Sequence, residues 1–266
     1  MRTKSSEAII ITGAANGIGR SLALHLAKEH TVLGLIDVDL TGLETVSEDC
    51  KRAGSSVVIA NIDVINTEQM EVFINTFYNE NGSIDYLIAN AGISPKLSND
   101  HSPQMARSLM ETNYIRMINS VHPAVSHMTN QRSGTIVIVT SISKLVSTFN
   151  SGSYSASKAA AAAYLNSLRI RLRNTQIKVV EITCGFVDTK MNEGSAHAHF
   201  VMIDADAAAR KIARAMRNAQ SHGSIPFLRN LPWYLLSILP RIIRDSIIEM
   251  ARRRVVNSAS ARERTH

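Results

Sequence analysis

Short apolar runs alternate along this chain with longer segments in which apolar residues recur every three or four positions. The runs are rich in β-branched residues, as expected for strands buried on both faces of a parallel sheet. Six such runs lie at residues 8–11, 31–36, 57–64, 84–89, 134–140 and 177–182. Helical spacing is found at residues 22–27, 70–78, 103–128 and 154–172. This alternation predicts an α/β fold, a doubly wound parallel sheet of the Rossmann type with helices on both faces and right-handed crossovers.

The length of 266 residues suits one large α/β domain, because the sequence has no repeat, low-complexity linker or break in composition. We expect a single domain that covers residues 1–266. Its core would span about residues 7–225, followed by an amphipathic helical extension at about 227–256 and a disordered tail at 257–266.

The extension carries apolar residues at three- and four-residue spacing, which predicts an apolar stripe along a helix. The stripe consists of Leu235, Leu239, Ile242, Ile243, Ile247 and Met250. Three burial sites are open: over the substrate cleft as a lid for a bulky apolar substrate, against a second subunit, or in an anionic membrane interface. Trp233, Tyr234 and the nearby arginines would suit the membrane interface. Packing on protein is the commoner fate of such a stripe, so we favour the lid or the subunit contact.

The net charge of +7 is unevenly placed, because residues 241–266 hold seven arginines against three acidic residues, 7 − 3 = +4. Basic residues are not interleaved with aromatic ones and no nucleic-acid motif is present, so we do not expect nucleic acid as a partner. Arg241 and Arg244 interrupt the extension and exclude a membrane span. The first apolar run is too short for a signal peptide, which favours a cytoplasmic protein with membrane association through the extension as an alternative.

Cysteine and histidine spacing argues against a metal site. Cys50 and Cys184 are far apart, which fits a reducing compartment and builds no disulfide framework. His197 and His199 lie close together but lack further ligands, so we expect no metal.

A glycine-rich segment, Thr12 to Gly19, follows the first predicted strand and opens a helix. Such a turn lets a pyrophosphate approach the backbone, and the helix N-terminus supplies amide donors and a favourable dipole. The strand, turn and helix therefore form a candidate dinucleotide site.

Asp37 ends the second predicted strand, eighteen residues after Gly19. A carboxylate at this place suits the ribose hydroxyls of NAD and repels the 2′-phosphate of NADP. Neither Asn16 nor Val38 offers a cation for that phosphate, so NAD is favoured and NADP is the alternative. The alternative role of Asp37 is to cap a strand-end turn with Asp39.

Two more strand ends carry candidate residues. Asp63 follows the third predicted strand, where its carboxylate would accept from an adenine amino group or serve as the N-cap of the next helix. The fourth predicted strand ends in Asn90-Ala91-Gly92, and these small residues permit a cofactor to lie across the strand end.

Four polar side chains form the candidate catalytic set. Asn113 lies in the middle of a long helical segment, where Asn competes with backbone hydrogen bonds, so it has a task such as holding water. Ser141 ends the fifth predicted strand, at the edge where open α/β sheets bind ligands. Tyr154 and Lys158 share one helical face because they are four residues apart. A cation beside a phenol lowers the phenol pKa, which allows proton exchange with a carbonyl or alcohol oxygen.

Together, the turn from Thr12 to Gly19, Asn90-Ala91-Gly92, Asn113, Ser141 and Tyr154-x-x-x-Lys158 resemble the short-chain dehydrogenase/reductase family over about residues 7–190. The resemblance implies an NAD-dependent oxidoreductase that acts on a secondary alcohol or ketone. In that family pattern Tyr154 is the acid/base and Ser141 orients the substrate oxygen. Lys158 would bind the nicotinamide ribose and lower the Tyr154 pKa, and Asn113 would hold a water in a proton relay.

The resemblance also implies the cofactor contacts. The residues that match the pyrophosphate turn are Gly13, Asn16, Gly17, Ile18 and Gly19. Those that match the adenosine side and the strand end beside it are Asp37, Asp63, Val64, Asn90, Ala91 and Gly92. Val187 and Thr189 match the segment that fixes the carboxamide and a nearby phosphate. A homodimer or homotetramer is implied as well, paired through the helices of Asn113 and Tyr154, where Ala159 to Ala163 permit close packing.

Two positions depart from the family pattern. Cys184-Gly185 stands where Pro-Gly is usual, which would loosen that turn. We expect Cys184 to be a small buried residue, and a redox thiol is the alternative. Lys144 stands where a small residue is usual, and we expect it to point to solvent, with contact to an anionic substrate as the alternative. A dinucleotide-binding sensor without turnover is the alternative function, and the intact Ser141, Tyr154 and Lys158 argue against it.

Overall fold

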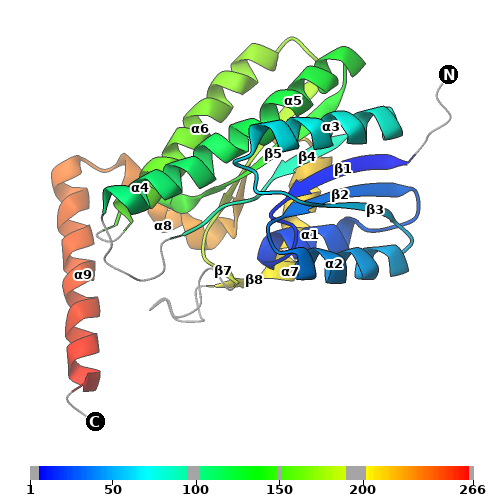
Figure 1. The fold of residues 1–266 in the computed structure, drawn as a ribbon. Coiled ribbons are helices and arrows are strands. Elements are labelled where there is room, and N and C mark those ends of the chain that lie inside the picture. The colour runs from blue at the N-terminus through cyan, green and yellow to red at the C-terminus, as the bar shows by residue number, and fades with distance from the viewer. Residues whose placement is uncertain (1–5, 95–101, 149–150, 190–201, 264–266) are drawn as a thin grey trace.

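The computed structural model describes residues 6–94, 102–148, 151–189 and 202–263, with side chains described as far as Arg253. Within these residues, a seven-stranded parallel sheet has the strand order β3-β2-β1-β4-β5-β6-β9 (Figure 1). Its strands are β1 (Glu7–Thr12), β2 (Thr31–Asp37), β3 (Ser56–Asn61), β4 (Tyr86–Ala89), β5 (Gly134–Ser141), β6 (Ile177–Cys184) and β9 (His222–Ile225). A second small sheet pairs β7 (Val187–Asp188) with β8 (Ile203–Asp204).

Helices cover both faces of the main sheet, which confirms the predicted doubly wound fold (Figure 1). One face is covered by α1 (Gly17–Leu26), α2 (Leu40–Arg52) and α7 (Ala205–Arg217). The other is covered by α3 (Thr67–Asn81), α5 (Arg116–Gln131) and α6 (Gly152–Leu172). Two short helical segments precede α5, namely α4 (Pro103–Met110) and the π-helical turn η1 (Glu111–Ile115), and the 3₁₀ turn η2 (Ile142–Lys144) follows β5.

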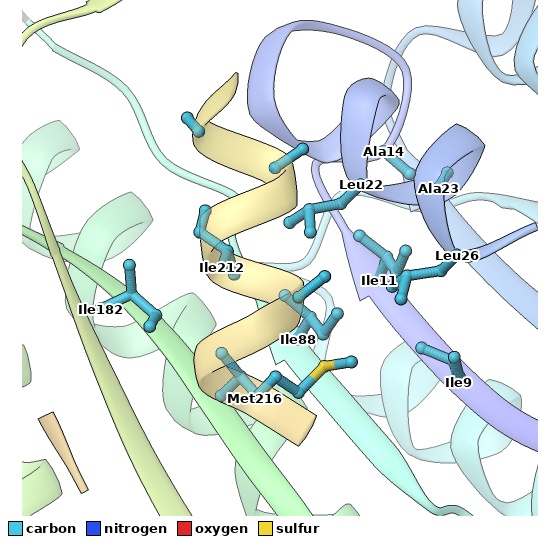
Figure 2. Close-up of a cluster of buried hydrophobic side chains, with 14 of the residues drawn as sticks. Ile9, Ile11, Ala14, Leu22, Ala23, Leu26, Ile88, Ile182, Ile212 and Met216 are labelled. Carbon is cyan, nitrogen blue, oxygen red and sulfur yellow. The ribbon is translucent and has the colours of Figure 1, made fainter. Parts of the chain in front are cut away.

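The strands separate two apolar cores because successive side chains of a strand point to opposite faces. In β1, Ile9 and Ile11 pack with α1, α2 and α7, whereas Ile10 packs with the helices of the other face. Figure 2 shows Ile212 and Met216 of α7 in the first of these cores, with side chains from α1 and the central strands around them. Burial on both faces explains why the strands are continuous apolar runs rather than alternating ones.

All six strands predicted from the sequence are present, with ends shifted by a few residues, but several elements were missed, namely α2, α7, β7, β8 and β9. Strand β9 adds a seventh strand beside β6, and α7 connects β8 to it. The sequence of β9, His222-Gly-Ser-Ile225, carries a single strongly apolar residue, so its pattern gives little indication of a strand. Pairing with β6 from Glu181 to Cys184 is what fixes it in the sheet.

The long helical segment predicted at residues 103–128 is interrupted by η1, which contains Asn113. A π-helical turn changes the register of the helix by one residue, and such turns are frequent at functional sites. The interruption therefore falls at Asn113, the residue of this segment that was expected to hold a water.

The C-terminal extension forms two helices, α8 (Phe227–Ile238) and α9 (Arg241–Glu263). Helix α8 packs against β9, whereas α9 lies apart from the sheet (Figure 1). The predicted apolar stripe is largely exposed: Ile242 is 84% accessible and Ile243, Ile247 and Met250 are also exposed. The described residues of this chain therefore do not cover the stripe, and a contact with a second subunit or with a membrane surface stays open. Helix α9 also continues beyond residue 256, where the extension was expected to end.

Candidate active site

The predicted site residues gather at the carboxyl ends of β1, β4, β5 and β6. The strand order reverses between β1 and β4, because β2 and β3 lie on one side of β1 and β5 and β6 on the other. Open α/β sheets bind ligands in the crevice at such a switch point. The N-terminal part of α6 brings Tyr154 and Lys158 to the same edge.

The glycine-rich turn has the backbone that its sequence predicts. Gly13 and Gly17 have φ values of +68° and +52°, in the left-handed region that favours glycine. At Gly19 a Cβ atom would lie 1.9 Å from the carbonyl oxygen of Gly13, so only glycine fits where α1 meets β1. Asn16 is the N-cap position of α1 and has no side-chain cap hydrogen bond; its amide donates to Asp39 Oδ2 at 2.9 Å. The turn and the first amides of α1 therefore form a cradle suited to a pyrophosphate.

Asn90 supports this cradle from the end of β4. Its side-chain Nδ2 donates to the carbonyl oxygens of Thr12 and Gly13, at 3.2 and 3.1 Å. The backbone amides of Asn90 and Ala91 both donate to Thr12 Oγ1, each at 3.1 Å. Asn90 thus holds the glycine-rich turn in place, a supporting role beside the adenosine contact expected of it.

Asp37 reaches from the end of β2 to the same turn. Its Oδ2 accepts from the backbone N–H of Ala15 at 3.0 Å, and its Oδ1 accepts from the N–H of Asp39 at 3.1 Å. The second bond is the strand-end turn that the sequence offered as the alternative role. The first bond places the carboxylate beside the glycine-rich turn, where a cofactor ribose would be expected.

Asp63 is not the N-cap of the following helix, contrary to one of the two expectations. The N-cap of α3 is Asn66, whose side chain accepts from Gln69 N. Asp63 instead accepts from the N–H of Ile65 at 3.1 Å and pairs with the Arg116 guanidinium at 3.2 Å. The neighbouring Val64 is buried among apolar side chains beneath α3 and α5.

Asn113 joins three separate segments at the carboxyl-end edge of the sheet: η1, the segment after β4, and α6. Its Oδ1 accepts from the N–H of Ile93, and its Nδ2 donates to the carbonyl oxygen of Ile93, both at 2.9 Å. The same Nδ2 also donates to Ser157 Oγ of α6 at 3.0 Å. A Cβ atom at Gly92 would lie 2.9 Å from Asn113 Oδ1 and 3.2 Å from Lys158 Nζ, so the strand end, η1 and α6 meet at this glycine.

Ser141 is accompanied by a second hydroxyl that the sequence analysis missed. Ser141 Oγ and Ser143 Oγ are 2.6 Å apart, and the Ser143 N–H points to Ser141 Oγ at 3.3 Å. Both serines hydrogen-bond to the side chain of Tyr154, which favours the ionised phenol. Burial acts more strongly in the opposite direction, so the net effect raises the Tyr154 pKa above its ordinary value. The tyrosine is therefore protonated at neutral pH.

Lys158 lies in the buried part of the site, with its Nζ 5.9 Å from the centre of the Tyr154 ring. Burial lowers the Lys158 pKa to about 8. Within the described residues, its Nζ donates to the carbonyl oxygen of Val139 over a long 3.5 Å. Burial dominates the Tyr154 pKa in this structure, and the lowering of that pKa by Lys158 stays a prediction.

The Cys184-Gly185 turn is held more firmly than the sequence suggested. Cys184 is buried, and burial raises its pKa to about 12, which fits a small buried residue rather than a reactive thiol. Gly185 N donates to the carbonyl oxygen of Ile225 at 2.8 Å. A Cβ atom at Gly185 would lie 2.3 Å from Oδ1 of Asn230, a buried residue of α8. Helix α8 therefore packs closely on this glycine and leaves no room for a side chain there.

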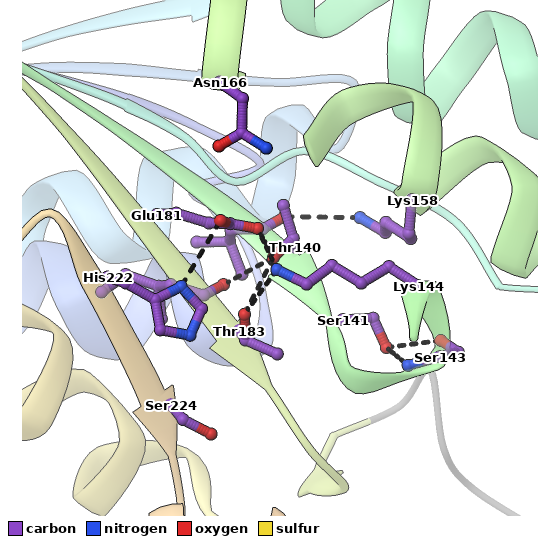
Figure 3. Close-up of polar contacts among 12 residues, drawn as sticks. Thr140, Ser141, Ser143, Lys144, Lys158, Asn166, Glu181, Thr183, His222 and Ser224 are labelled. Carbon is purple, nitrogen blue, oxygen red and sulfur yellow. Dashed lines mark hydrogen bonds and ion pairs between the residues drawn. The ribbon is translucent and has the colours of Figure 1, made fainter. Parts of the chain in front are cut away.

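Lys144 was expected to point to solvent, with contact to an anionic substrate as the alternative, and the expectation of solvent is wrong. Its side chain is buried and forms an ion pair with Glu181 of β6, and its Nζ also donates to Thr183 Oγ1 at 2.9 Å (Figure 3). Burial lowers the Lys144 pKa, and the bond to Glu181 opposes that fall. The ammonium is therefore committed to the protein interior.

The segment after β6 returns to the glycine-rich turn. Val187 is buried in β7, and Thr189 Cγ2 is 3.0 Å from the position of a Cβ atom on Gly17. The predicted carboxamide segment and pyrophosphate turn are therefore in contact. His197 and His199 lie outside the described residues, and among the residues described no group of three or more His, Cys, Asp or Glu side chains is placed to hold a metal ion.

Residues 7–199 match a family model described as short chain dehydrogenase. A cis-4-hydroxycyclohexanecarboxylate dehydrogenase of Sinomonas cyclohexanicum is 31% identical over 222 residues, which cover 82% of this chain and 87% of that protein. An uncharacterized oxidoreductase of Myxococcus xanthus is 25% identical over 92% of this chain and 98% of its own length. An 11-beta-hydroxysteroid dehydrogenase-like 2 protein of Arabidopsis thaliana is 31% identical over 70% of this chain, but the match spans only 61% of that longer protein.

Solved structures share the fold. A short chain dehydrogenase/reductase from Burkholderia phymatum in complex with NAD superposes with a TM-score of 0.74 at 22% identity, covering 84% of this chain and 90% of that one. An alcohol dehydrogenase from Thermococcus sibiricus complexed with 5-hydroxy-NADP gives a TM-score of 0.73 at 22% identity over 83% of this chain and 94% of that one.

Proposed function

Because this chain belongs to the short-chain dehydrogenase family, we propose that it transfers hydride between a nicotinamide dinucleotide and a secondary alcohol or ketone. The observation that carries the proposal is the meeting of a protonated Tyr154, the Ser141 hydroxyl and the buried Lys158 ammonium at the edge of the sheet that also holds the glycine-rich turn. A phenol, a second hydroxyl and a cation are the groups that proton transfer to a carbonyl oxygen requires.

The residues of this chain have separable tasks in ketone reduction. Ser141 Oγ donates to the substrate carbonyl oxygen and orients it, supported by Ser143 Oγ at 2.6 Å. Tyr154 gives its proton to the same oxygen as negative charge develops there. Lys158 has ammonium hydrogens to spare beyond the long bond to Val139, and it stabilises the phenolate left on Tyr154. In alcohol oxidation the proton moves the other way.

The residues present fit a nicotinamide dinucleotide. The turn with positive φ at Gly13 and Gly17 would hold the pyrophosphate, Asp37 the adenosine ribose and Lys158 the nicotinamide ribose. When bound, the nicotinamide ring supplies or accepts the hydride. Asp37 favours NAD over NADP because its carboxylate repels a 2′-phosphate. Titration of the protein with each cofactor tests this preference: a tighter Kd for NADPH than for NADH would overturn it.

The substrate is proposed to be a ketone or alcohol whose reacting carbon lies in a saturated ring. The Lys144 ammonium is occupied by Glu181 and gives no support to an anionic group beside Ser141. The names of two relatives refer to a hydroxycyclohexane carboxylate and a hydroxysteroid, both with the hydroxyl on a saturated ring. A panel of cyclic and acyclic ketones, each with NADH and NADPH, should therefore give the highest kcat/KM for a cyclic member.

The alternative of a sensor without turnover is tested by the same panel. If this chain is an enzyme, Tyr154→Phe should lose turnover, because the change removes the proton donor. If NADH binds, no member of the panel is reduced or oxidised, and Tyr154→Phe changes nothing, the proposed activity is refuted.

We also propose that the protein is a homo-oligomer paired through α5 and α6. Ala163 and Ile170 of α6 are exposed, with Ile170 67% accessible, so this face has apolar atoms available for a twofold contact. Sedimentation at micromolar concentration should give at least the mass of a dimer, and a monomer would refute the pairing.

The exposed apolar side chains of α8 and α9 are proposed to bind an anionic membrane surface. Leu228, Ile238 and Ile242 are 78%, 78% and 84% accessible, and Arg241 is exposed next to Ile242. Protruding apolar side chains flanked by arginines suit insertion between lipid headgroups. No helix among the described residues is both long and apolar enough to cross a bilayer.

Flotation of the full chain with vesicles that contain anionic lipid tests this surface. Binding should be lost in Ile242→Asp, while Ala251→Asp, which adds the same charge at an exposed position on the side of the helix away from Ile242, should retain more of it. Equal flotation of both variants and the wild type would refute insertion of this face.

A further inference from the structure

A chain of polar contacts runs from the carboxyl end of β5 to helix α8, buried at its centre and exposed at its α8 end, and the proposed chemistry does not use it. Lys144 and Glu181 are its centre, with side chains only 8% and 6% accessible (Figure 3). Lys144 ends η2, the turn that begins directly after Ser141 and contains Ser143. Glu181 lies within β6, a strand whose other inward positions are apolar or small.

Three different elements supply polar contacts to Glu181: η2, β5 and β9. Oε1 accepts from Lys144 Nζ and from Thr140 Oγ1 of β5, the latter at 3.0 Å. Oε2 is 3.4 Å from Nδ1 of His222, which lies opposite Glu181 in the register of β6 and β9. Lys144 Nζ also donates to Thr183 Oγ1. These bonds lower the Glu181 pKa to about 2 even though burial alone would raise it.

The chain continues into the C-terminal region. The other ring nitrogen of His222, Nε2, is 2.9 Å from the hydroxyl of Tyr234 in α8, and the two rings meet edge to face at 86°. Helix α8 is also anchored by Asn230, which packs on Gly185 and donates to Ser224 Oγ at 3.0 Å. A continuous path of polar contacts therefore links η2, β6, β9 and α8.

We propose that Lys144 is a positioning residue: its ion pair with Glu181 fixes the η2 turn and so holds the Ser141 and Ser143 hydroxyls against Tyr154, and His222 and Tyr234 join α8 to the same support. The proposal rests on the proposed function for its catalytic consequence. Its physical basis is that η2 is a single short turn. A lysine at the end of that turn, drawn into the sheet by a buried carboxylate, restricts the backbone on which both serines stand.

A purely structural ion pair is the competing explanation, and stability alone does not separate the two. Removing one partner of a buried pair leaves an uncompensated charge and destabilises the fold, whereas removing both charges together is often nearly neutral. The double variant Lys144→Met/Glu181→Gln is therefore informative, because it should regain thermal stability and still lack the ion pair that fixes the η2 turn.

The experiment compares the wild type, Lys144→Met, Glu181→Gln and the double variant in the full-length protein. Thermal unfolding, kcat and KM on the best substrate of the panel, and hydrogen exchange of the peptide that covers residues 141–146 are measured for each. Lys178→Met is the matched control, because Lys178 is an exposed lysine on the same strand as Glu181. It should match the wild type in all three measurements.

We expect the single variants to lose both thermal stability and kcat. The double variant should regain most of the thermal stability, yet keep a kcat that is lower by about tenfold or more, since small misplacements of reacting groups are costly. Its KM for the cofactor should stay near that of the wild type, and its 141–146 peptide should exchange faster. Tyr234→Phe should lower kcat in the same direction by a smaller factor.

A double variant that regains kcat and slow exchange along with stability would overturn the proposal, and the pair would then be structural only. If the wild type turns over no member of the panel, the proposed function fails, and the exchange of the 141–146 peptide alone decides whether Lys144 holds the turn.

Discussion

The buried carboxylate of Glu181 should make the stability of this protein depend on acid in a measurable way. Its pKa is lowered from 4.5 to about 2 by hydrogen bonds from His222, Lys144 and Thr140, which outweigh the opposing effect of burial. A carboxyl group whose pKa is lower in the folded state contributes stability that is fully present above its unfolded value. That contribution is lost as the pH falls from about 4.5 toward about 2.

The magnitude follows from the two pKa values. At about 1.36 kcal/mol per pKa unit, the change from 4.5 to about 2 corresponds to about 3 kcal/mol at neutral pH. About 2 kcal/mol of this should be lost between about pH 7 and pH 3, because in that range the unfolded chain takes up the proton and the folded chain does not.

Urea unfolding at a series of pH values between 7 and 3, at one protein concentration, measures this loss. Lys144→Met/Glu181→Gln is the reference, because it removes the titrating carboxylate and its buried partner together. Glu71→Gln/Lys178→Met removes the same two charges from exposed positions and should follow the wild type. The double variant of the buried pair should lose about 2 kcal/mol less than the wild type over this range. Parallel curves for all three proteins would show that Glu181 is not held ionised by its neighbours.

Two further predictions concern the catalytic edge. The kcat/KM for ketone reduction should fall as the pH rises through about 8, because the free enzyme loses the Lys158 proton there. This fall should be absent in Lys158→Met. A flat wild-type profile from pH 7 to 9 would contradict the lowered Lys158 pKa. Gly92→Ala should reduce kcat/KM by about tenfold or more, because its Cβ would press on Asn113 and Lys158. Gly152→Ala should leave kcat/KM unchanged, because no atom lies within 4 Å of the new Cβ. Equal activity of the two variants would show that the contact at Gly92 is unimportant.

The fold and the central site could be predicted from the sequence because their signals are local. The strands are continuous apolar runs, the glycines stand where the turn requires positive φ, and Tyr154 and Lys158 are brought together by a single helix. These features need no knowledge of distant parts of the chain.

The features that were missed depend on contacts between distant residues. Lys144 finds its partner 37 residues away, so its burial could not be deduced from its neighbours. A signal was present in Glu181, since a carboxylate within an apolar strand requires a buried partner. Strand β9 was missed because its pairing with β6, rather than its own composition, makes it a strand. The burial that raises the Tyr154 pKa also depends on the whole fold and could not be deduced from the spacing of Tyr154 and Lys158.

The exposure of α9 has a different cause. Helical spacing predicts that apolar side chains share one face, but it does not say what covers that face. The structure shows that the described residues of this chain leave it open, and the choice between lipid and a second subunit rests on experiment.

Single-turnover reduction of the best ketone by the wild type and by Tyr154→Phe, each preloaded with NADH, tests the central claim most directly. Removing the phenolic hydroxyl takes away the proposed proton donor but leaves the glycine-rich turn, Asp37 and Lys158 in place. We predict that Tyr154→Phe binds NADH with a Kd near that of the wild type and reduces the ketone slower by roughly 10²- to 10⁴-fold. Reduction at the wild-type rate by Tyr154→Phe would contradict the assignment of Tyr154 as the acid.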